Sequence, residues 1–536
     1  MSLGLITSAA YVNAEMAAEF GLLPPAFLPI GNARLYSLQA KALRGHVDRI
    51  ALSLPRSFEA PDYDLRALEA LGVEIIRIPD GLRLADSIMQ ALLKGLDGLE
   101  PVTILHGDTL IADLAPFPLD SFSVHRREHP YPWATLNEGA TPRINPADLT
   151  ERARRDSAIV SGLFRFSDPL GLLRALTDES GDFVAVLNEY DRRHPLAPVI
   201  DQSQWLDFGH LNTYYSSRRE MTTERAFNSL SFEGDVVFKH SAQHDKMRAE
   251  ANWFASLPTS MKLFTPQFLG ERDGGPDGAS GYCLEYEHLS PLSDLHVFGA
   301  LPARSWRGIF RSCAEFLDLA KAAKPATFDP DWRGELYEAK SRARLAEFAA
   351  ASGFEMDQPW RLNGVDTPSP LQIVNEMSAL IPALTAAEVG VMHGDFCFSN
   401  LLFDFRRRRI KVLDPRGYVG GYRGVFGDTR YDLGKLYHSV GGRYDFIIGG
   451  FFDAQRDGPR SLRFELPDTP LHGEIEQAFA DDLCGGDPAR LQLAAAISVV
   501  LFLSMLPLHY DRPDRQLAFL GNAFRLYLRH FGNPGR

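Results

Sequence analysis

One segment near the C-terminus restricts the fold and the chemistry of this chain more than any other. Residues 391–417 read VMHGDFCFSNLLFDFRRRRIKVLDPRG, so that His393-Gly394-Asp395 follows an apolar pair and Asn400 comes five residues after Asp395. An apolar strand predicted over residues 410–413 then ends in Asp414. Phosphoryl transfer needs a carboxylate that orients the attacking hydroxyl and accepts its proton, together with hard oxygen ligands for Mg²⁺. A loop followed by a β-hairpin would bring Asp395, Asn400 and Asp414 to one point.

This spacing resembles that of the aminoglycoside phosphotransferase and choline kinase family, which has a two-lobed protein-kinase-like (α+β) fold. The resemblance extends over about residues 221–510. It implies that Asp395 is the catalytic base, that Asn400 and Asp414 bind Mg²⁺, and that ATP is the phosphoryl donor. Lys239, in VVFKHS, matches the family's lysine on the phosphates, and Glu250 is its expected helix partner.

The resemblance also predicts the nucleotide contacts of this region. The hinge between the lobes is expected near Glu287 and Leu289, where the backbone would bind the adenine edge. The expected phosphate loop, residues 228–235, has one glycine where the family pattern is Gly-rich. The hydroxyls of Ser229 and Ser231 are therefore the candidate nucleotide ligands.

Three further features of this region leave alternatives open. Asp432 either supports the catalytic loop, as in the family, or interacts with the N-terminus of a helix as a plain carboxylate. Asp414 is followed by Pro415-Arg416-Gly417 instead of Phe-Gly, which we do not take as a loss of activity. The basic run at residues 406–409 is predicted to be a solvated hairpin tip.

Before residue 220, strand-like and helix-like segments alternate. The strand candidates are residues 3–7, 49–54, 73–78, 102–105, 158–166 and 183–187, and the helical ones include 35–43 and 84–93. This alternation predicts an α/β domain with a mainly parallel sheet and helices on both faces. The polar segment 214–220 is expected to join it to a small β-rich lobe and then a large helical lobe. We therefore predict domains at residues 1–220 and 221–536.

The N-terminal region resembles sugar-phosphate nucleotidyltransferases, which implies a Rossmann-like fold of the GT-A type. The resemblance rests on PPAFLPIGNARLYSLQ at residues 24–39, on Asp108 in ILHGDTL and on Asp207 in WLDFGH. Nucleotidyl transfer needs Mg²⁺ held by carboxylates, and Asp108 follows a strand end, where such ligands lie. Asp108 and Asp207 are therefore the predicted metal ligands of this domain.

This N-terminal sequence departs from the family pattern at two places. Ser8-Ala9-Ala10-Tyr11 stands where a Gly-rich loop is expected, so Ser8 and Ala9 become the candidate nucleotide contacts. Ala26 stands where the family has a lysine, and Arg34 is the candidate that would replace its charge.

Composition excludes some classes of protein. The 536 residues include 56 Lys and Arg and 69 Asp and Glu, and the resulting net charge of −13 disfavours a general nucleic-acid role. The four cysteines are too few for a disulfide framework, which points to a reducing compartment. The apolar run at residues 493–506 is too short to span a bilayer and is predicted to be a buried helix. A cytoplasmic enzyme without membrane insertion or a signal peptide is the expectation.

The leading hypothesis is a bifunctional enzyme. One domain would phosphorylate a small alcohol or sugar with ATP, and the other would join that phosphate to a nucleotide from CTP, UTP or GTP and release pyrophosphate. The product would be an activated donor for surface polysaccharide or cell-wall synthesis. One alternative is a small-molecule kinase with a degenerate, nucleotide-binding regulatory N-terminal domain. A non-catalytic scaffold is the third hypothesis, and the oligomeric state stays open.

Overall fold

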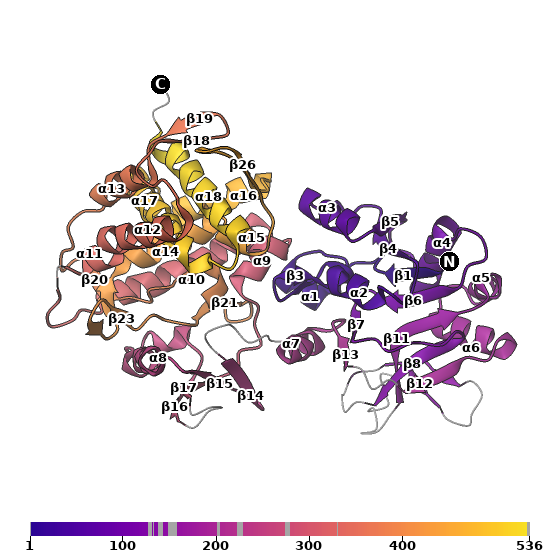
Figure 1. Ribbon diagram of the computed structural model, residues 1–536. Helices are drawn as coiled ribbons and strands as arrows, with labels where there is room; N and C mark the ends of the chain where they lie inside the picture. Colours follow the sequence, from indigo (N-terminus) through magenta and orange to yellow (C-terminus); the bar gives the residue numbers. More distant parts are fainter. Residues whose placement is uncertain are drawn as a thin grey trace. The chain divides into compact units, whose positions relative to one another are not determined.

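The computed structural model describes residues 2–126, 131, 133–137, 143–147, 158–200, 204–221, 229–273, 279–329 and 331–532. The chain forms two compact units (Figure 1). The first comprises Met1–Met221 with Phe298–Ala300, and the second comprises Thr222–Val297 with Leu301–Arg536.

The main sheet of the first unit has four parallel strands and an antiparallel extension. The parallel strands run in the order β5, β4, β1, β6, where β1 is Leu3–Thr7, β4 is Arg49–Pro55, β5 is Val73–Ile78 and β6 is Val102–His106. Beyond β6, β11 (Ala158–Phe166) is antiparallel to β6, and β8 (Ser121–Arg126) is antiparallel to β11. Because Thr7 pairs with His106, the residues that follow β1 and β6 meet at one edge of the sheet.

Three helices cover this sheet and supply its core. They are α4 (Leu84–Gly95), α5 (Pro169–Asp178) and α6 (Phe183–Arg193), whose apolar residues join those of the strands in one cluster. The strand predicted over residues 183–187 is wrong, because these residues begin α6. The Asp182 side chain caps this helix by accepting hydrogen bonds from the backbone N–H groups of Val184 and Ala185.

The polar segment 214–220 is not an extended connection. It lies within helix α7 (Leu211–Glu220) of the first unit. Tyr214 and Tyr215 are buried, and Ser217 donates a hydrogen bond to the Asp207 carbonyl. The tyrosines therefore anchor this helix in the unit, which the polar composition of the segment conceals.

The second unit begins with a small antiparallel sheet. Its strands lie in the order β14 (Ser229–Glu233), β15 (Val236–Ser241), β17 (Ser280–Glu285) and β16 (Phe268–Arg272). Helix α8 (His244–Ser256) packs on this sheet and buries Trp253 and Phe254. Residues 274–278 of the expected hairpin loop lie outside the described residues.

The larger lobe of the second unit is mostly helical. Its long helices are α10 (Ala303–Ala322), α12 (Glu338–Ser352), α14 (Thr429–Val440), α17 (Pro488–Ser504) and α18 (Pro513–Phe531). Helix α17 contains residues 493–504 of the predicted apolar run, and residues 494–504 are all buried. It lies close against α14, since a Cβ on Gly434 would come within 2.2 Å of Ile497.

The predicted fold class is confirmed: an α/β unit is followed by a two-lobed α+β unit. All four cysteines are free. Within the described ranges no helix has the length and apolar character needed to cross a bilayer.

Candidate functional site

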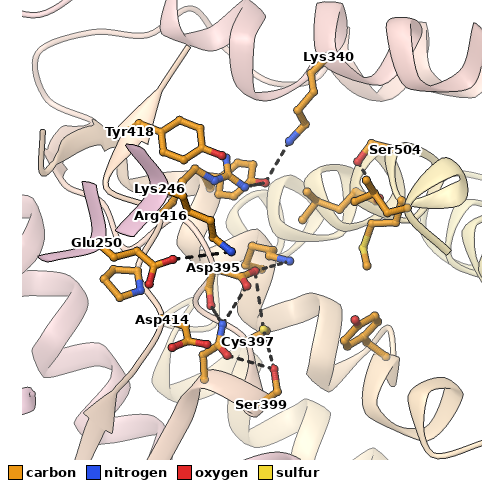
Figure 2. Close-up of a pocket in the computed structure, with 18 of the residues that line it drawn as sticks. Lys246, Glu250, Lys340, Asp395, Cys397, Ser399, Asp414, Arg416, Tyr418 and Ser504 are labelled. Atoms are coloured by element: carbon orange, nitrogen blue, oxygen red, sulfur yellow. Dashed lines mark hydrogen bonds and ion pairs between the residues drawn. The ribbon is translucent and has the colours of Figure 1, made fainter. Parts of the chain in front are cut away.

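The site in the second unit is built on the loop that follows strand β20 (Val389–Val391). Asp395 lies in this loop, and its two carboxylate oxygens have different partners. Oδ1 lies 2.7 Å from Nζ of Lys435, and Oδ2 accepts a hydrogen bond from Nδ2 of Asn400 at 2.9 Å (Figure 2). Burial alone would raise the pKa of Asp395, but the Lys435 ammonium lowers that pKa below its usual value. Asp395 is therefore held as an oriented carboxylate.

The backbone of this loop is fixed by a buried carboxylate on α14. Asp432 accepts hydrogen bonds from the N–H groups of His393 at 2.7 Å and Gly394 at 2.8 Å. Asp432 therefore supports the loop that carries Asp395, and it also lies in the first turn of α14, so the structure shows both features expected of it. Gly394 has φ +79°, and a Cβ there would lie 2.7 Å from Cβ of Arg416, so the turn requires glycine.

An ion-pair network with a buried lysine and a buried glutamate connects the two lobes of this unit. Nζ of Lys239, on β15, lies 2.6 Å from Oε2 of Glu250 on α8 and 2.9 Å from Oδ1 of Asp414. Tyr282 donates a hydrogen bond to the same Glu250 oxygen at 2.8 Å. Burial alone would lower the pKa of Lys239, but Asp414 and Glu250 raise it above its usual value. The lysine is therefore an ammonium whose position is set from both lobes.

Asn400 and Asp414 come together through the hairpin of β21 (Leu401–Asp404) and β22 (Arg409–Val412). Leu413 donates a backbone hydrogen bond to the Asn400 carbonyl at 2.9 Å, which closes the base of the hairpin. The expected basic tip is also present, because residues 405–408 form the turn. A cavity of about 380 Å³ is lined by Asp395, Asn400, Asp414, Lys239 and Glu250, among others.

This donor set fits Mg²⁺. Nδ2 of Asn400 donates to Asp395, so the amide oxygen of Asn400 is directed away from Asp395. Asp414 supplies a carboxylate to the same cavity. An amide oxygen and a carboxylate are hard ligands of the kind that Mg²⁺ prefers. No group of three or more His, Cys, Asp or Glu suited to a metal occurs in the described part of the chain, so a cation here would depend on the amide as well.

Among the described residues, the predicted nucleotide contacts Ser231, Glu287 and Leu289 do not line that cavity. Ser231 lies within β14 and pairs with Phe238, so it belongs to a strand and not to a loop. Glu287 and Leu289 follow β17, in the connection between the lobes, and Glu287 pairs with Lys411 at 3.0 Å. The side chain of Ser229 and all of Asn228 lie outside the described residues.

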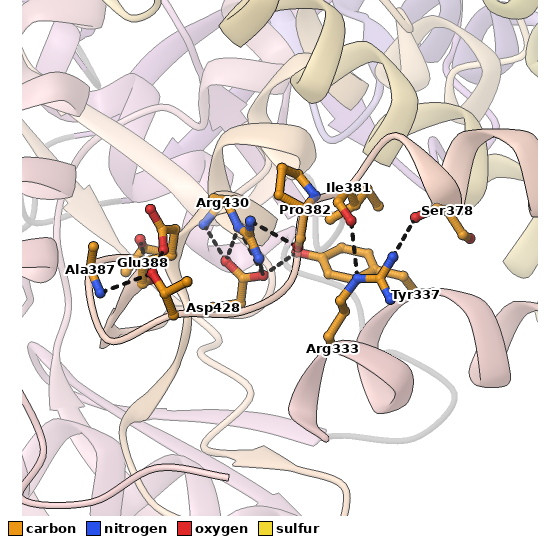
Figure 3. Close-up of polar contacts among 11 residues, drawn as sticks. Arg333, Tyr337, Ser378, Ile381, Pro382, Ala387, Glu388, Asp428 and Arg430 are labelled. Atoms are coloured by element: carbon orange, nitrogen blue, oxygen red, sulfur yellow. Dashed lines mark hydrogen bonds and ion pairs between the residues drawn. The ribbon is translucent and has the colours of Figure 1, made fainter. Parts of the chain in front are cut away.

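The N-terminus of α14 is anchored by a second network (Figure 3). Asp428, which is fully buried, caps the helix by accepting a hydrogen bond from the Arg430 N–H at 3.0 Å. Its carboxylate pairs with the Arg430 guanidinium at 2.7 Å and accepts from the Tyr337 hydroxyl at 3.1 Å. Because α14 carries Asp432 and Lys435, this network holds the supports of Asp395 in place.

In the first unit, Asp108 and Asp207 are brought together. Asp108 follows β6, and Asp207 ends β13 (Gln204–Asp207), which pairs with β7 (Thr109–Ala112). A Cβ on Gly209 would lie 2.7 Å from Oδ2 of Asp108 and 3.5 Å from Oδ1 of Asp207. Burial and the neighbouring Asp207 raise the pKa of Asp108 to about 6. Among the described residues, Oδ2 of Asp207 is buried without a hydrogen bond, with Nδ1 of His210 3.9 Å away, so this carboxylate pair fits a cation.

The predicted nucleotide contacts of the first unit, Ser8, Ala9 and Arg34, are buried, and Ser8 and Arg34 bind other residues of the unit. Ser8 accepts a hydrogen bond from the Ala26 N–H at 2.9 Å and is buried, as is Ala9. Ser8 still lies at the edge of the sheet near Asp108, since a Cβ on Gly107 would come within 2.9 Å of Cβ of Ser8. Arg34 is buried and pairs with Asp64 at 2.8 Å, so its charge is already balanced inside the unit.

The sequence analysis missed several residues of the cavity in the second unit. Lys435 follows Asp432 by one helical turn, and this spacing could have indicated its place. Tyr431 directly precedes Asp432 in the same helix. Others come from distant segments and gave no signal: Lys340, Arg344 and Ser504.

The family comparison agrees with the geometry of the second unit. Residues 233–464 match the phosphotransferase enzyme family. No curated protein matches the chain. Solved structures match the N-terminal region at low similarity. A nucleoside-diphosphate-sugar pyrophosphorylase from Vibrio cholerae RC9 has 13% identity and a TM-score of 0.33, covering 40% of this chain and 99% of that one.

A second solved structure that is similar to this chain is the inositol-1-phosphate CTP transferase from T. maritima. It has 14% identity and a TM-score of 0.31, covering 41% of this chain and 96% of that one. The family match includes Lys239, Asp395, Asn400 and Asp414. Residues 233–464 of this chain therefore form a domain of the phosphotransferase enzyme family.

Proposed function

We propose that the second unit transfers the γ-phosphoryl group of ATP to a hydroxyl of a small alcohol or sugar. The observation that carries this proposal is the convergence of Asp395, Asn400, Asp414 and Lys239 on one cavity. These are the groups that phosphoryl transfer needs: a proton acceptor, oxygen ligands for a metal, and a cation for the phosphates.

Each group has a defined part in the transfer. Asp395 receives the proton of the acceptor hydroxyl, whose oxygen forms a bond to the γ-phosphorus while the bond from that phosphorus to the bridging oxygen breaks and ADP leaves. Lys239 binds the phosphates, and Glu250 sets its position. Asn400 and Asp414 would hold Mg²⁺, which neutralises phosphate charge when it is bound.

We further propose that the first unit joins the phosphorylated product to a nucleotide from CTP, UTP or GTP and releases pyrophosphate. The pair Asp108 and Asp207 supports this, because two close carboxylates, one of which (Asp108) has a raised pKa, gain stability from a divalent cation. The consecutive reactions would make an activated donor for surface polysaccharide or cell-wall synthesis.

A second candidate for the first unit is nucleotide binding that regulates the kinase. It is favoured by the internal contacts of Ser8 and Arg34, which leave these residues directed at the protein and not at a triphosphate. This candidate predicts nucleotide binding without pyrophosphate release.

Acceptor-dependent ADP formation tests the kinase proposal. Full-length protein is incubated with Mg²⁺ and ATP against a panel of sugars, polyols and amino alcohols, and ADP is measured. We expect at least one acceptor to raise ADP formation well above the rate of ATP hydrolysis in water. ADP formation that no acceptor changes would count against the proposal.

A further inference from the structure

Three cationic side chains line the part of the cavity that lies beyond Asp395. They are Lys340 and Arg344 on α12 and Arg416 in the loop after Asp414, and we refer to these three as the cationic cluster. Figure 2 shows Lys340 and Arg416 on one side of Asp395, and Asp414 and Ser399 on the other. Lys340 and Arg416 therefore lie on the side of Asp395 opposite to Asp414.

The contacts of the cluster are to a tyrosine hydroxyl and a backbone carbonyl. Nη2 of Arg416 donates to the Tyr431 hydroxyl at 3.0 Å, and Nζ of Lys340 lies 3.1 Å from the same oxygen. Nη1 of Arg344 donates to the Ser504 carbonyl at 3.2 Å. Within the part of the chain that the structure describes, none of the three forms an ion pair with a carboxylate of Asp or Glu.

This arrangement has an electrostatic cost. Burial, together with the nearby Arg416, lowers the pKa of Lys340 to about 8. Burial and Arg416 also lower the pKa of Arg344. Burial and the cationic neighbours act in opposite directions on Tyr431, and its pKa falls to about 7 because Arg416 and Lys340 favour the phenolate. Buried cations that lie close together are stabilised when an anion binds between them.

The cluster is also coupled to the proposed proton acceptor. Arg416 contributes to the lowered pKa of Asp395, so the charges of the two interact across the cavity. The nucleotide phosphates have their own cation, Lys239, on the opposite lobe. An anion bound by the cluster would therefore belong to the second substrate.

We propose that the cationic cluster binds a carboxylate or phosphate group of the phosphoryl acceptor and so presents its hydroxyl to Asp395. This inference rests on the proposed kinase function and specifies its substrate class: the acceptor is a hydroxy compound that carries an anionic group. Alcohols that carry an ammonium group are repelled by the cluster. The anionic group itself is unchanged in the reaction.

Binding of small anions tests the cluster directly. Inorganic phosphate and sulfate are titrated calorimetrically into the full-length protein saturated with Mg²⁺ and a non-hydrolysable ATP analogue, so that the nucleotide site is filled. The variants are K340M and R344M, which keep an apolar stem. The matched control is R342M, because Arg342 lies on the same helix, is exposed and pairs with Glu338 at 3.1 Å.

We expect the wild type and R342M to bind these anions equally. K340M and R344M should each bind about 10-fold more weakly or worse, as for the loss of one charge-assisted hydrogen bond. Melting temperatures identify a variant that has failed to fold. The anion affinity of the other variant then tests the inference. Equal anion affinity in the wild type and in the folded K340M and R344M variants would overturn the inference, as would undetectable binding by the wild type.

A matched set of acceptors separates this inference from the kinase proposal. Glucose, glucosamine, glucuronate and glucose 6-phosphate share one skeleton and differ in charge, and ADP formation is measured with each. We expect a higher kcat/KM for glucuronate or glucose 6-phosphate than for glucose, with glucosamine lowest, and a loss of that preference in K340M. Comparing the two anions identifies the group that is recognised.

Each outcome of the acceptor set has one meaning. A preference for glucose or glucosamine refutes the inference and leaves the kinase proposal intact. Anion binding that depends on Lys340, without ADP formation from any acceptor in this or the broader panel, supports the anion site and counts against the kinase proposal.

Discussion

Asp395 is the residue on which the kinase proposal depends most. An asparagine at this position keeps the size of the side chain but cannot receive the hydroxyl proton. We expect D395N to lower acceptor-dependent ADP formation on the order of 10³-fold or more, as for other catalytic groups. Its affinity for Mg²⁺ and ADP should stay close to that of the wild type, because Lys239 lies on the other lobe. A D395N enzyme that keeps a tenth of the activity would contradict this role.

At the residue scale, the sequence predicted the groups that act in the reaction better than the groups that support them. The spacing of Asp395, Asn400 and Asp414 follows from one local loop and hairpin, so it can be recognised along the chain. Lys340 reaches the cavity from a helix whose position depends on packing. Arg34 shows the opposite case: its sequence position suggested a ligand contact, and Asp64, distant in the sequence, pairs with it instead.

At the scale of elements, helix α14 depends on its N-cap. Asp428 is fully buried and balances the charge of Arg430. We expect D428A to lower the free energy of unfolding by about 3 to 5 kcal/mol, because it leaves the Arg430 guanidinium, which is 11% exposed, without its carboxylate partner. The matched control is D514A, which removes an exposed pair with Arg512 and should cost at most about 1 kcal/mol. Urea denaturation measures the unfolding free energy of both variants. Equal losses in D428A and D514A would contradict the role of Asp428 as the N-cap on which α14 depends.

Helix α16 (Pro470–Asp482) begins with a capping box that contains a histidine. Nδ1 of His472 accepts a hydrogen bond from the Thr469 N–H at 3.1 Å, and burial lowers the pKa of His472 to about 4. The unfolded chain takes up this proton near pH 6.5. The stability that neutral His472 contributes is therefore present above pH 6.5 and is lost as the pH falls toward 4.

The H472Q variant tests this pH dependence, since glutamine can keep the capping box without titrating. Between pH 7.5 and pH 5, the wild type should lose about 2 kcal/mol more unfolding free energy than H472Q, at about 1.4 kcal/mol per pKa unit. Urea denaturation at the two pH values measures the difference. Equal losses in the two proteins would show that His472 does not titrate in this way.

The elements that sequence patterns predicted correctly are those with strong local signals. The apolar run of α17 and the strands β1, β4, β5, β6 and β11 follow from periodicity and composition. The strand predicted over residues 183–187 was wrong because Phe183-Val184-Ala185-Val186-Leu187 is a short apolar run, which suits a strand or a helix equally. Only the Asp182 cap and the packing against the sheet decide for the helix.

At the scale of the whole molecule, the two proposed reactions have separate residues. D108A and D207A should lower pyrophosphate release from a supplied phosphorylated substrate and nucleotide on the order of 10³-fold, and should leave ADP formation unchanged. D395N should have the reverse effect. If D395N also abolished nucleotidyl transfer from the supplied phosphorylated substrate, the two-site account would be wrong.

The account as a whole is tested most directly by pyrophosphate release. The full-length protein is incubated with Mg²⁺, ATP and each of CTP, UTP and GTP, against hydroxy acids, sugar acids and sugar phosphates, with neutral and amino alcohols as controls. The account predicts pyrophosphate that requires ATP, one second nucleotide and one anionic acceptor together. ADP formation without pyrophosphate, for every combination, would contradict nucleotidyl transfer by the first unit and leave a kinase whose N-terminal unit binds nucleotide for regulation.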